Sequence, residues 1–367
     1  MNNINVKIAK RKRLVRIALI ALTAIVLICV GVGIYLVSLW KNGVRLNRDT
    51  MFVTEQTNVT LERELEQTAE PQTEPQQTPV PEYEGKSTVK HGDRYYVLNE
   101  DVFSILFMGV DADDDEQFDN IGVTAHQSDT LILAVINPEE NRLTMINIPR
   151  MTITDVKQLD AAFNYARTTR SPICIQYAFG DGKALSCTLT RDAVSNLLFN
   201  IPISRYISMN LDGLYAANDA LGGVTVTLLD DMTAFNPKME KGIEYTLLGK
   251  DAEIYLARRL GKGLDGTNMS RTKRHIQYYK AFFSAAKNKL KDDLMFAINL
   301  YNAMGDSVQT DMSIEEMMYL SKAVLNMDIK DENIHTLVGT VKNEDFFVDD
   351  EALRELLIEV FYTEVPQ

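Results

Sequence analysis

The sequence predicts a mixed α/β (α+β) domain with a central mixed β-sheet flanked by helices, preceded by one N-terminal transmembrane helix. Short apolar runs bounded by turn residues indicate buried strands, and apolar residues that recur every three or four positions indicate helices packed on a core. An uncharged apolar stretch near the N-terminus indicates the membrane helix. The 367 residues leave room for one large domain once that helix and a linker are subtracted.

Residues 17–40 contain no charged side chain and are long enough to cross roughly 30 Å of hydrocarbon as a helix. The alternative is a cleaved signal peptide, which has a shorter apolar core followed by a small-residue cleavage site. Basic residues are denser in residues 1–16 than after residue 40. The positive-inside rule therefore predicts a cytoplasmic tail at 1–16 and everything after 40 outside the membrane.

Residues 41–93 are predicted to be an extracytoplasmic disordered linker. The stretch 54–86 is dense in Glu, Gln, Thr and Pro and poor in large apolar residues. Such a composition cannot bury enough apolar surface to fold alone. The folded domain is predicted to span 94–367, with a helical C-terminal extension.

Three apolar runs predict neighbouring buried strands at Phe103–Asp111, Thr130–Ile136 and Arg142–Ile148. Residues Asn137–Asn141 read Asn-Pro-Glu-Glu-Asn, a composition typical of a turn. The second and third strands are therefore predicted to form a hairpin.

Helical patterns alternate with further strands after residue 180. Arg271 opens an amphipathic helix with apolar residues at helical spacing. The other predicted elements are helices at Thr190–Leu198, Asp212–Leu221, Ile314–Leu325 and Asp350–Phe361, and strands at Val224–Leu228 and near Ile334–Val341.

Charge and cysteine content exclude several classes of function. The net charge is −13, which argues against nucleic-acid binding because polyphosphate backbones require a basic surface. The cysteines Cys29, Cys174 and Cys187 lack zinc-site spacing. A Cys174–Cys187 disulfide and two free buried thiols both remain open.

Charged residues stand at the ends of the three predicted strands. Asp111 ends the first, Asp129 precedes the second, and Arg150 follows the third. An Asp after a strand is more often a turn or cap residue, but together these ends bring two carboxylates and a guanidinium toward one edge of the sheet. Open sheets usually place their sites there.

A second group of basic residues comprises Arg258, Arg259, Arg271 and Arg274, the last two on one predicted helix face. A solvated surface is the simpler interpretation of such a run. Guanidinium groups near a helix start, beside strand-end carboxylates that hold Mg²⁺, are also what a pyrophosphate site requires.

Seven segments occur in an order that resembles the LytR-CpsA-Psr family over about residues 102–290. They are LFMGVD ending at Asp111, SDT at Thr130, LTMINIPR at Arg150, LDAAFNY at Tyr165, IPISRYISMNLDGL at Leu214, DALGGVTV at Val226 and SRTKR at Arg274. The resemblance implies a LytR-CpsA-Psr-like fold and a single-pass protein of the bacterial cell membrane with its main domain outside. It also implies a phosphotransferase that moves an undecaprenyl-pyrophosphate-linked glycopolymer, such as teichoic acid or capsular polysaccharide, to peptidoglycan and releases undecaprenyl phosphate.

The resemblance also implies roles for individual residues. Asp111 and Asp129 would hold Mg²⁺ and, with Arg150, form the catalytic group. Arg150, Arg271 and Arg274 would contact the pyrophosphate together with Arg258 or Arg259, between which the sequence does not decide. The polyprenyl tail would need an apolar tunnel between sheet and helices.

Some positions depart from the family pattern. Gln127 and Ala257 stand where arginines are usual, Met151 and Asp160 where Asp and Asn are usual, and His275 where Gln is usual. These departures leave two alternatives open. One is a non-catalytic member that binds lipid-linked precursors and regulates envelope assembly, and the other is a polyprenyl-pyrophosphate hydrolase.

Overall fold

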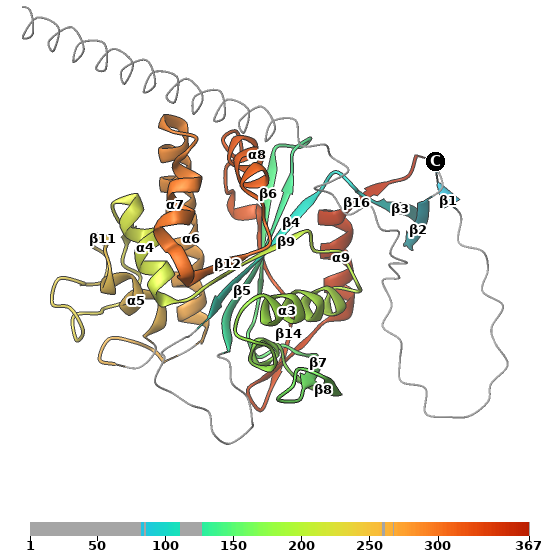
Figure 1. Ribbon diagram of the computed structural model, residues 1–367, viewed down its shortest axis with the longest axis horizontal. Coiled ribbons are helices and arrows are strands. Elements are labelled where there is room, and N and C mark those ends of the chain that lie inside the picture. Colours follow the sequence, from blue (N-terminus) through green and yellow to red (C-terminus); the bar gives the residue numbers. More distant parts are fainter. Residues whose placement is uncertain (1–81, 84–85, 111–126, 259–260, 267, 367) are drawn as a thin grey trace, which may run out of the picture.

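The computed structural model describes residues 82–83, 86–110, 127–258, 261–266 and 268–366. Its centre is a mixed sheet with helices on both faces, which confirms the predicted α/β class (Figure 1). No helix among the described residues is both long and apolar enough to cross a membrane. The predicted membrane segment, residues 17–40, lies outside the described part of the chain.

The central sheet contains the three predicted strands side by side. β4 pairs antiparallel with β5 and β5 antiparallel with β6, as the predicted hairpin requires. Parallel pairs, β4 with β9 and β6 with β13, extend it on both sides. In spatial order the six strands are β12 (Val308–Thr310), β9 (Arg205–Met209), β4 (Phe103–Val110), β5 (Ser128–Asn137), β6 (Arg142–Ile148) and β13 (Ile334–Thr336).

Both faces of the sheet are apolar, which explains why β5 reads as a continuous apolar run rather than an alternating one. Leu131, Leu133 and Val135 face a core that includes residues of α3 (Ala184–Leu197) and α9 (Asp350–Phe361). The residues between them face α6 (Asn268–Asp292) and α8 (Ile314–Val324) on the opposite side (Figure 1).

A second core lies beside the sheet. It is built from α4 (Leu211–Leu221), β10 (Val224–Thr227), β11 (Glu244–Leu247), α5 (Lys250–Ala257) and one side of α6. Helix α4 ends at Gly222 with φ 82°, a left-handed conformation that favours glycine. Helix α6 packs against both the second core and the core on the sheet, one on each side of its axis. Helix α7 (Phe296–Met304) packs against α4.

Two hairpins and a short helix surround the end of β6. They are β7 (Ile153–Leu159) with β8 (Tyr165–Pro172), β14 (Gly339–Lys342) with β15 (Asp345–Val348), and the 3₁₀ helix η1 (Ile173–Phe179). The strand predicted near Ile334–Val341 is therefore two strands, β13 and β14, in different sheets. Helix α3 begins at Ala184, earlier than the predicted Thr190.

A small sheet joins the two ends of the described chain. β1 (Glu82–Tyr83), β2 (Lys86–His91) and β3 (Arg94–Leu98) pair in order, and β16 (Tyr362–Glu364) pairs with β3. Regular structure thus begins before residue 94, within the range predicted as linker. The physical reason is that the C-terminal strand supplies hydrogen-bonding partners that the local composition does not reveal.

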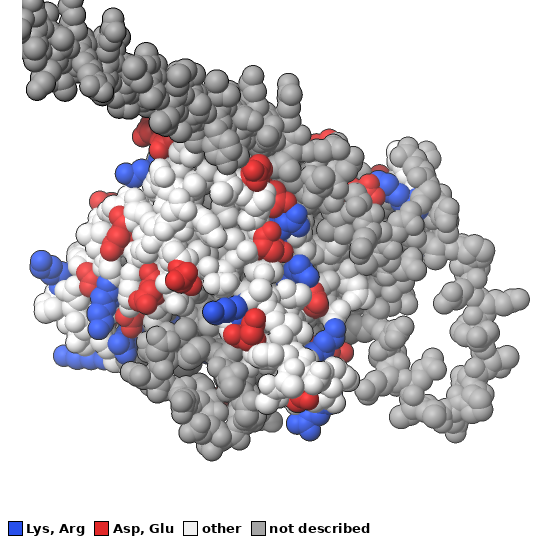
Figure 2. All heavy atoms as spheres, viewed as in Figure 1, with Lys and Arg blue, Asp and Glu red and all other residues white. Residues whose placement is uncertain are grey.

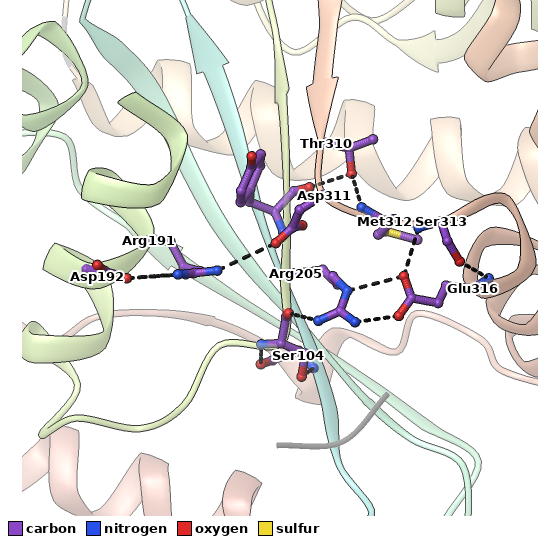
Figure 3. Close-up of polar contacts among 11 residues, drawn as sticks. Ser104, Arg191, Asp192, Arg205, Thr310, Asp311, Met312, Ser313 and Glu316 are labelled. Carbon is purple, nitrogen blue, oxygen red and sulfur yellow. Dashed lines mark hydrogen bonds and ion pairs between the residues drawn. The ribbon is translucent and has the colours of Figure 1, made fainter. Parts of the chain in front are cut away.

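The C-terminal part is fixed to β9 by a polar network (Figure 3). Arg205 contacts both carboxylate oxygens of Glu316, with Nε donating to Oε2 over 3.2 Å. Ser313 and Glu316 form a capping box at the start of α8. Asp311 accepts from the backbone N–H of Tyr206 at 2.9 Å. These bonds hold α8 and the segment after β12 against β9.

Candidate functional site

The centre of the candidate site is an ion pair between Arg150 and Asp129. Nη1 of Arg150 contacts Oδ1 of Asp129, and the two side chains remain 25% and 30% exposed. They meet because β5 starts beside the end of β6, with Leu131 opposite Ile148. This confirms that the strand ends bring a carboxylate and a guanidinium together. Asp111 follows β4 directly but lies outside the described residues.

Gln127 and Cys174 complete the surroundings of Arg150. Nη2 of Arg150 donates to Oε1 of Gln127 over 2.7 Å, and the Sγ of Cys174 lies 3.8 Å from Nη2. Burial raises the pKa of the Cys174 thiol, although the nearby guanidinium acts in the opposite direction. Cys174 and Cys187 are both free and buried, so the open disulfide alternative is not what the structure shows. No motif in the sequence indicated that Cys174, on η1, would reach this site.

Helix α6 approaches the same end of the sheet. Tyr279 lies near Thr130, the residue after Asp129, and burial raises the pKa of Tyr279 to about 12. Arg271 is half-buried in the first turns of this helix. Its positive charge acts on both Tyr279 and His275. Arg271 is therefore positioned at the sheet end that carries Asp129.

Arg274 does not share a surface with Arg271. Arg274 is only 1% exposed and forms an ion pair with Asp230 at 2.9 Å, on the side of α6 that faces the second core. Arg258 is half-exposed, 3.8 Å from Glu253 and over the ring of Phe235. Arg259 lies outside the described residues. On the visible face, basic side chains gather at the edge that carries β11 and α5 (left in Figure 2).

A small cavity lies between the sheet and α6. Its walls are mostly apolar, and it lies on the face of β5 to which Thr130 also points. Phe107 of β4 is opposite Ile132 in the strand register, hence on this same face, and it remains 37% exposed although β4 is a central strand. The lining residues are Ile132, Met145, Asn147, His275, Ile276, Tyr279 and Ile334.

A magnesium site would depend on both strand-end carboxylates. The described residues contain no group of three or more His, Cys, Asp or Glu side chains that could hold a metal ion. Mg²⁺ usually takes only one or two carboxylates and completes its shell with water and substrate phosphates. Asp129 offers one such carboxylate, with Oδ1 occupied by Arg150, while Asp111 lies outside the described residues.

His275 makes folding sensitive to acid. Burial lowers its pKa to about 4, while Nε2 contacts the backbone oxygen of Leu256 at 2.9 Å. Because the unfolded chain binds this proton near pH 6.5, the stability contributed by neutral His275 is full above that pH and lost as the pH falls toward 4.

We expect His275→Gln to lose less stability than the wild type between pH 7 and pH 5 in urea unfolding. His91→Gln, on β2, controls for the loss of a histidine; an equal loss in wild type and His275→Gln would contradict the assignment.

Together these features define an α/β protein with a candidate anion site at the strand ends of a mixed sheet. The chain belongs to the LytR_cpsA_psr family, whose family model matches residues 55–359. This confirms the resemblance drawn from the sequence motifs.

Two teichoic acid transferases named TagU are similar to this chain over most of the domain. The polyisoprenyl-teichoic acid–peptidoglycan teichoic acid transferase TagU of Halalkalibacterium halodurans is 31% identical over 236 residues, covering 64% of this chain and 69% of that protein. TagU of Bacillus subtilis is 28% identical over 229 residues, covering 62% and 66%. The alignments thus span about two thirds of these relatives. The solved structure of B. subtilis TagV is 25% identical with a TM-score of 0.52, covering 71% of this chain and 98% of that one.

Proposed function

We propose that this protein is a cell-wall glycopolymer phosphotransferase. It moves an undecaprenyl-pyrophosphate-linked anionic polymer of the teichoic acid or capsular type to peptidoglycan and releases undecaprenyl phosphate. The observation that carries the proposal is the Asp129–Arg150 pair at the sheet end where α6 brings Arg271 and an apolar cavity. The names of the TagU relatives support transfer of a teichoic acid to peptidoglycan.

The residues suit transfer of a phosphoryl group between two oxygen atoms. In the proposed reaction a hydroxyl of peptidoglycan attacks the phosphorus next to the sugar. A new P–O bond forms, the P–O bond to the bridging oxygen breaks, and undecaprenyl phosphate leaves. Arg150 and Arg271 neutralise the phosphate charge, and Asp129 or Asp111 accepts the hydroxyl proton. Mg²⁺, held by Asp111 and Asp129, would add positive charge at the phosphate oxygens.

In the proposed complex the lipid part of the donor lies along the apolar surface around the small cavity. Ile132, Ile276 and Ile334 supply apolar walls, and the exposed face of Phe107 extends this surface along the sheet. The free energy falls when a polyprenyl chain leaves water for such a surface. The predicted membrane anchor at residues 17–40 would keep this domain near the lipid donor outside the cell membrane.

Reconstitution tests the proposal directly. The full-length protein in detergent is incubated with a polyprenyl-pyrophosphate glycan and peptidoglycan oligomers, with Mg²⁺ or with chelator, and polymer-linked peptidoglycan is measured by mass spectrometry. Mg²⁺-dependent transfer is the expected result. Tight donor binding without transfer would favour a non-catalytic binding role, and phosphate products without any acceptor would favour a hydrolase.

Arg271→Ala is expected to raise the KM for the lipid-linked donor by roughly ten- to a hundredfold. A charge-assisted hydrogen bond to a phosphate is worth about 1.5–3 kcal/mol, and alanine removes the charge and the donors. Initial rates at varied donor concentration measure the effect. Lys289→Ala is the matched control, because Lys289 is an exposed basic residue near the other end of α6. An unchanged KM in Arg271→Ala would exclude Arg271 from the donor site.

A further inference from the structure

Arg274 is enclosed by protein on the inner side of α6. It is among the largest fully buried side chains of the described residues, with 1% of its surface exposed. Its Nη1 lies 2.9 Å from Oδ2 of Asp230, its Nη2 donates to the backbone oxygen of Arg258, and its guanidinium lies over the ring of Tyr255 at 5.8 Å. A ligand at the surface therefore has no access to this guanidinium in the observed conformation.

Asp230 joins three segments through two bonds. It follows β10 by a few residues, it pairs with Arg274, and its Oδ2 accepts from Oγ of Ser270 at 2.7 Å. Ser270 lies in the first turn of α6. The segment after β10 is itself held by the backbone N–H of Leu229, which donates to the hydroxyl of Tyr255 on α5 over 3.2 Å. The Asp230–Arg274 pair and its neighbours thus connect the start of α6, the end of α5 and the segment after β10.

Burying this ion pair costs desolvation free energy that an apolar pair of similar size would avoid. The Nε of Arg274 is buried without a hydrogen-bond partner among the described residues, which adds to that cost. Such a pair contributes little net stability, so its value lies in the geometry that it imposes. That geometry fixes the backbone at Arg258, directly after α5, relative to the first turns of α6, where Arg271 lies.

We propose that Arg274 does not contact the pyrophosphate but is a positioning residue, which with Asp230 fixes the backbone at Arg258 and the start of α6. The inference rests on the proposed function and changes the role that the family resemblance implied for Arg274. Arg271 then binds the donor phosphates from a helix start whose position is set by the buried pair. Asp230, which no sequence motif indicated, is the other residue of this positioning ion pair.

Arginine is required here because its planar fork donates in two directions at once. Nη1 donates to the carboxylate of Asp230, and Nη2 donates to the backbone oxygen of Arg258. Lysine has the same charge but a single ammonium on a flexible stem, so it cannot reproduce both contacts in the same geometry. Arg274→Lys therefore preserves the charge and tests the position.

The test compares ligand affinity with local backbone opening in the full-length protein. Farnesyl pyrophosphate serves as a soluble probe of the donor, with affinity measured by calorimetry and amide hydrogen exchange followed in peptides covering residues 258–275. We expect Arg274→Lys to weaken binding about three- to thirtyfold, the usual range for residues that act through others. We also expect it to speed exchange in that segment. Lys273→Arg, its exposed neighbour on α6, is the matched control and should change neither quantity.

Ser270→Ala provides a second, milder variant, because it removes one bond to Asp230 and leaves the ion pair in place. It should produce a smaller change of the same kind. Unchanged affinity in Arg274→Lys, or weaker binding with unchanged exchange, would overturn the positioning role. If the wild type does not bind farnesyl pyrophosphate, the proposed function fails, while the exchange comparison still decides whether Arg274 holds the segment at Arg258.

Discussion

Asp129→Asn is expected to reduce polymer transfer by about a hundred- to a thousandfold, the range found when a transition-state charge partner is removed. Asparagine has the same shape but no charge, so Arg150 loses its counter-ion and a bound Mg²⁺ would lose a ligand. The side chain is 30% exposed, so the folded state tolerates the change. Transfer rates by mass spectrometry and the thermal unfolding midpoint, Tm, of the same samples separate the two effects.

Asp155→Asn is the matched control for this substitution. Asp155 on β7 also pairs with an arginine, Arg170, at 3.4 Å, but both of these side chains are more than half exposed. Its loss should leave transfer within a factor of about two, since exposed ion pairs contribute little. Transfer by Asp129→Asn at more than a tenth of the wild-type rate would show that the carboxylate is not part of the reaction.

The pairing of Asp129 with Arg150 was predictable from the sequence because both residues are tied to strand ends. The apolar runs and the turn at Asn137–Asn141 define β5, β6 and the hairpin between them. An antiparallel hairpin places the residue before its first strand beside the residue after its second strand. Local patterns were therefore sufficient to bring these two side chains together.

The environments of Arg274 and Cys174 were not predictable in this way. Arg274 pairs with Asp230, 44 residues earlier, and Cys174 contacts Gln127, 47 residues earlier. Helical spacing places Arg274 three residues after Arg271 but does not say which side of α6 faces the second core. That choice follows from apolar packing around Tyr278, which no short motif encodes.

The small sheet near residue 94 was not predicted from the sequence, for a related reason. Composition predicted a linker up to residue 93, yet β2 pairs with β3, and β3 also pairs with β16 at the other end of the chain. Arg94 and Glu364, 270 residues apart, form an ion pair across this sheet. Strand pairing over such a separation depends on the rest of the fold to bring both ends together.

Arg205→Ala is expected to destabilise the domain by about 2–4 kcal/mol, because it leaves the carboxylate of Glu316 buried without its charged partner. Glu316 is only 6% exposed, and Arg205 contacts both of its oxygens (Figure 3). The loss should lower the Tm by about 4–16 °C for a domain of this size. Urea unfolding followed by circular dichroism measures the change in the free energy of unfolding. Exchange of amides in α8 and β12 should accelerate most, since these elements depend on the contact with β9.

The double variant Arg205→Met/Glu316→Leu separates the loss of a partner from the loss of packing. Replacing both members of a buried ion pair by apolar residues of similar size is often neutral or stabilising, so this variant should recover most of the lost stability. Arg94→Ala is the exposed control, because Arg94 and Glu364 are 59% and 42% exposed and an ion pair at such a site contributes little stability. If Arg205→Ala and Arg94→Ala cost the same, the network in Figure 3 does not hold the C-terminal segment to the sheet.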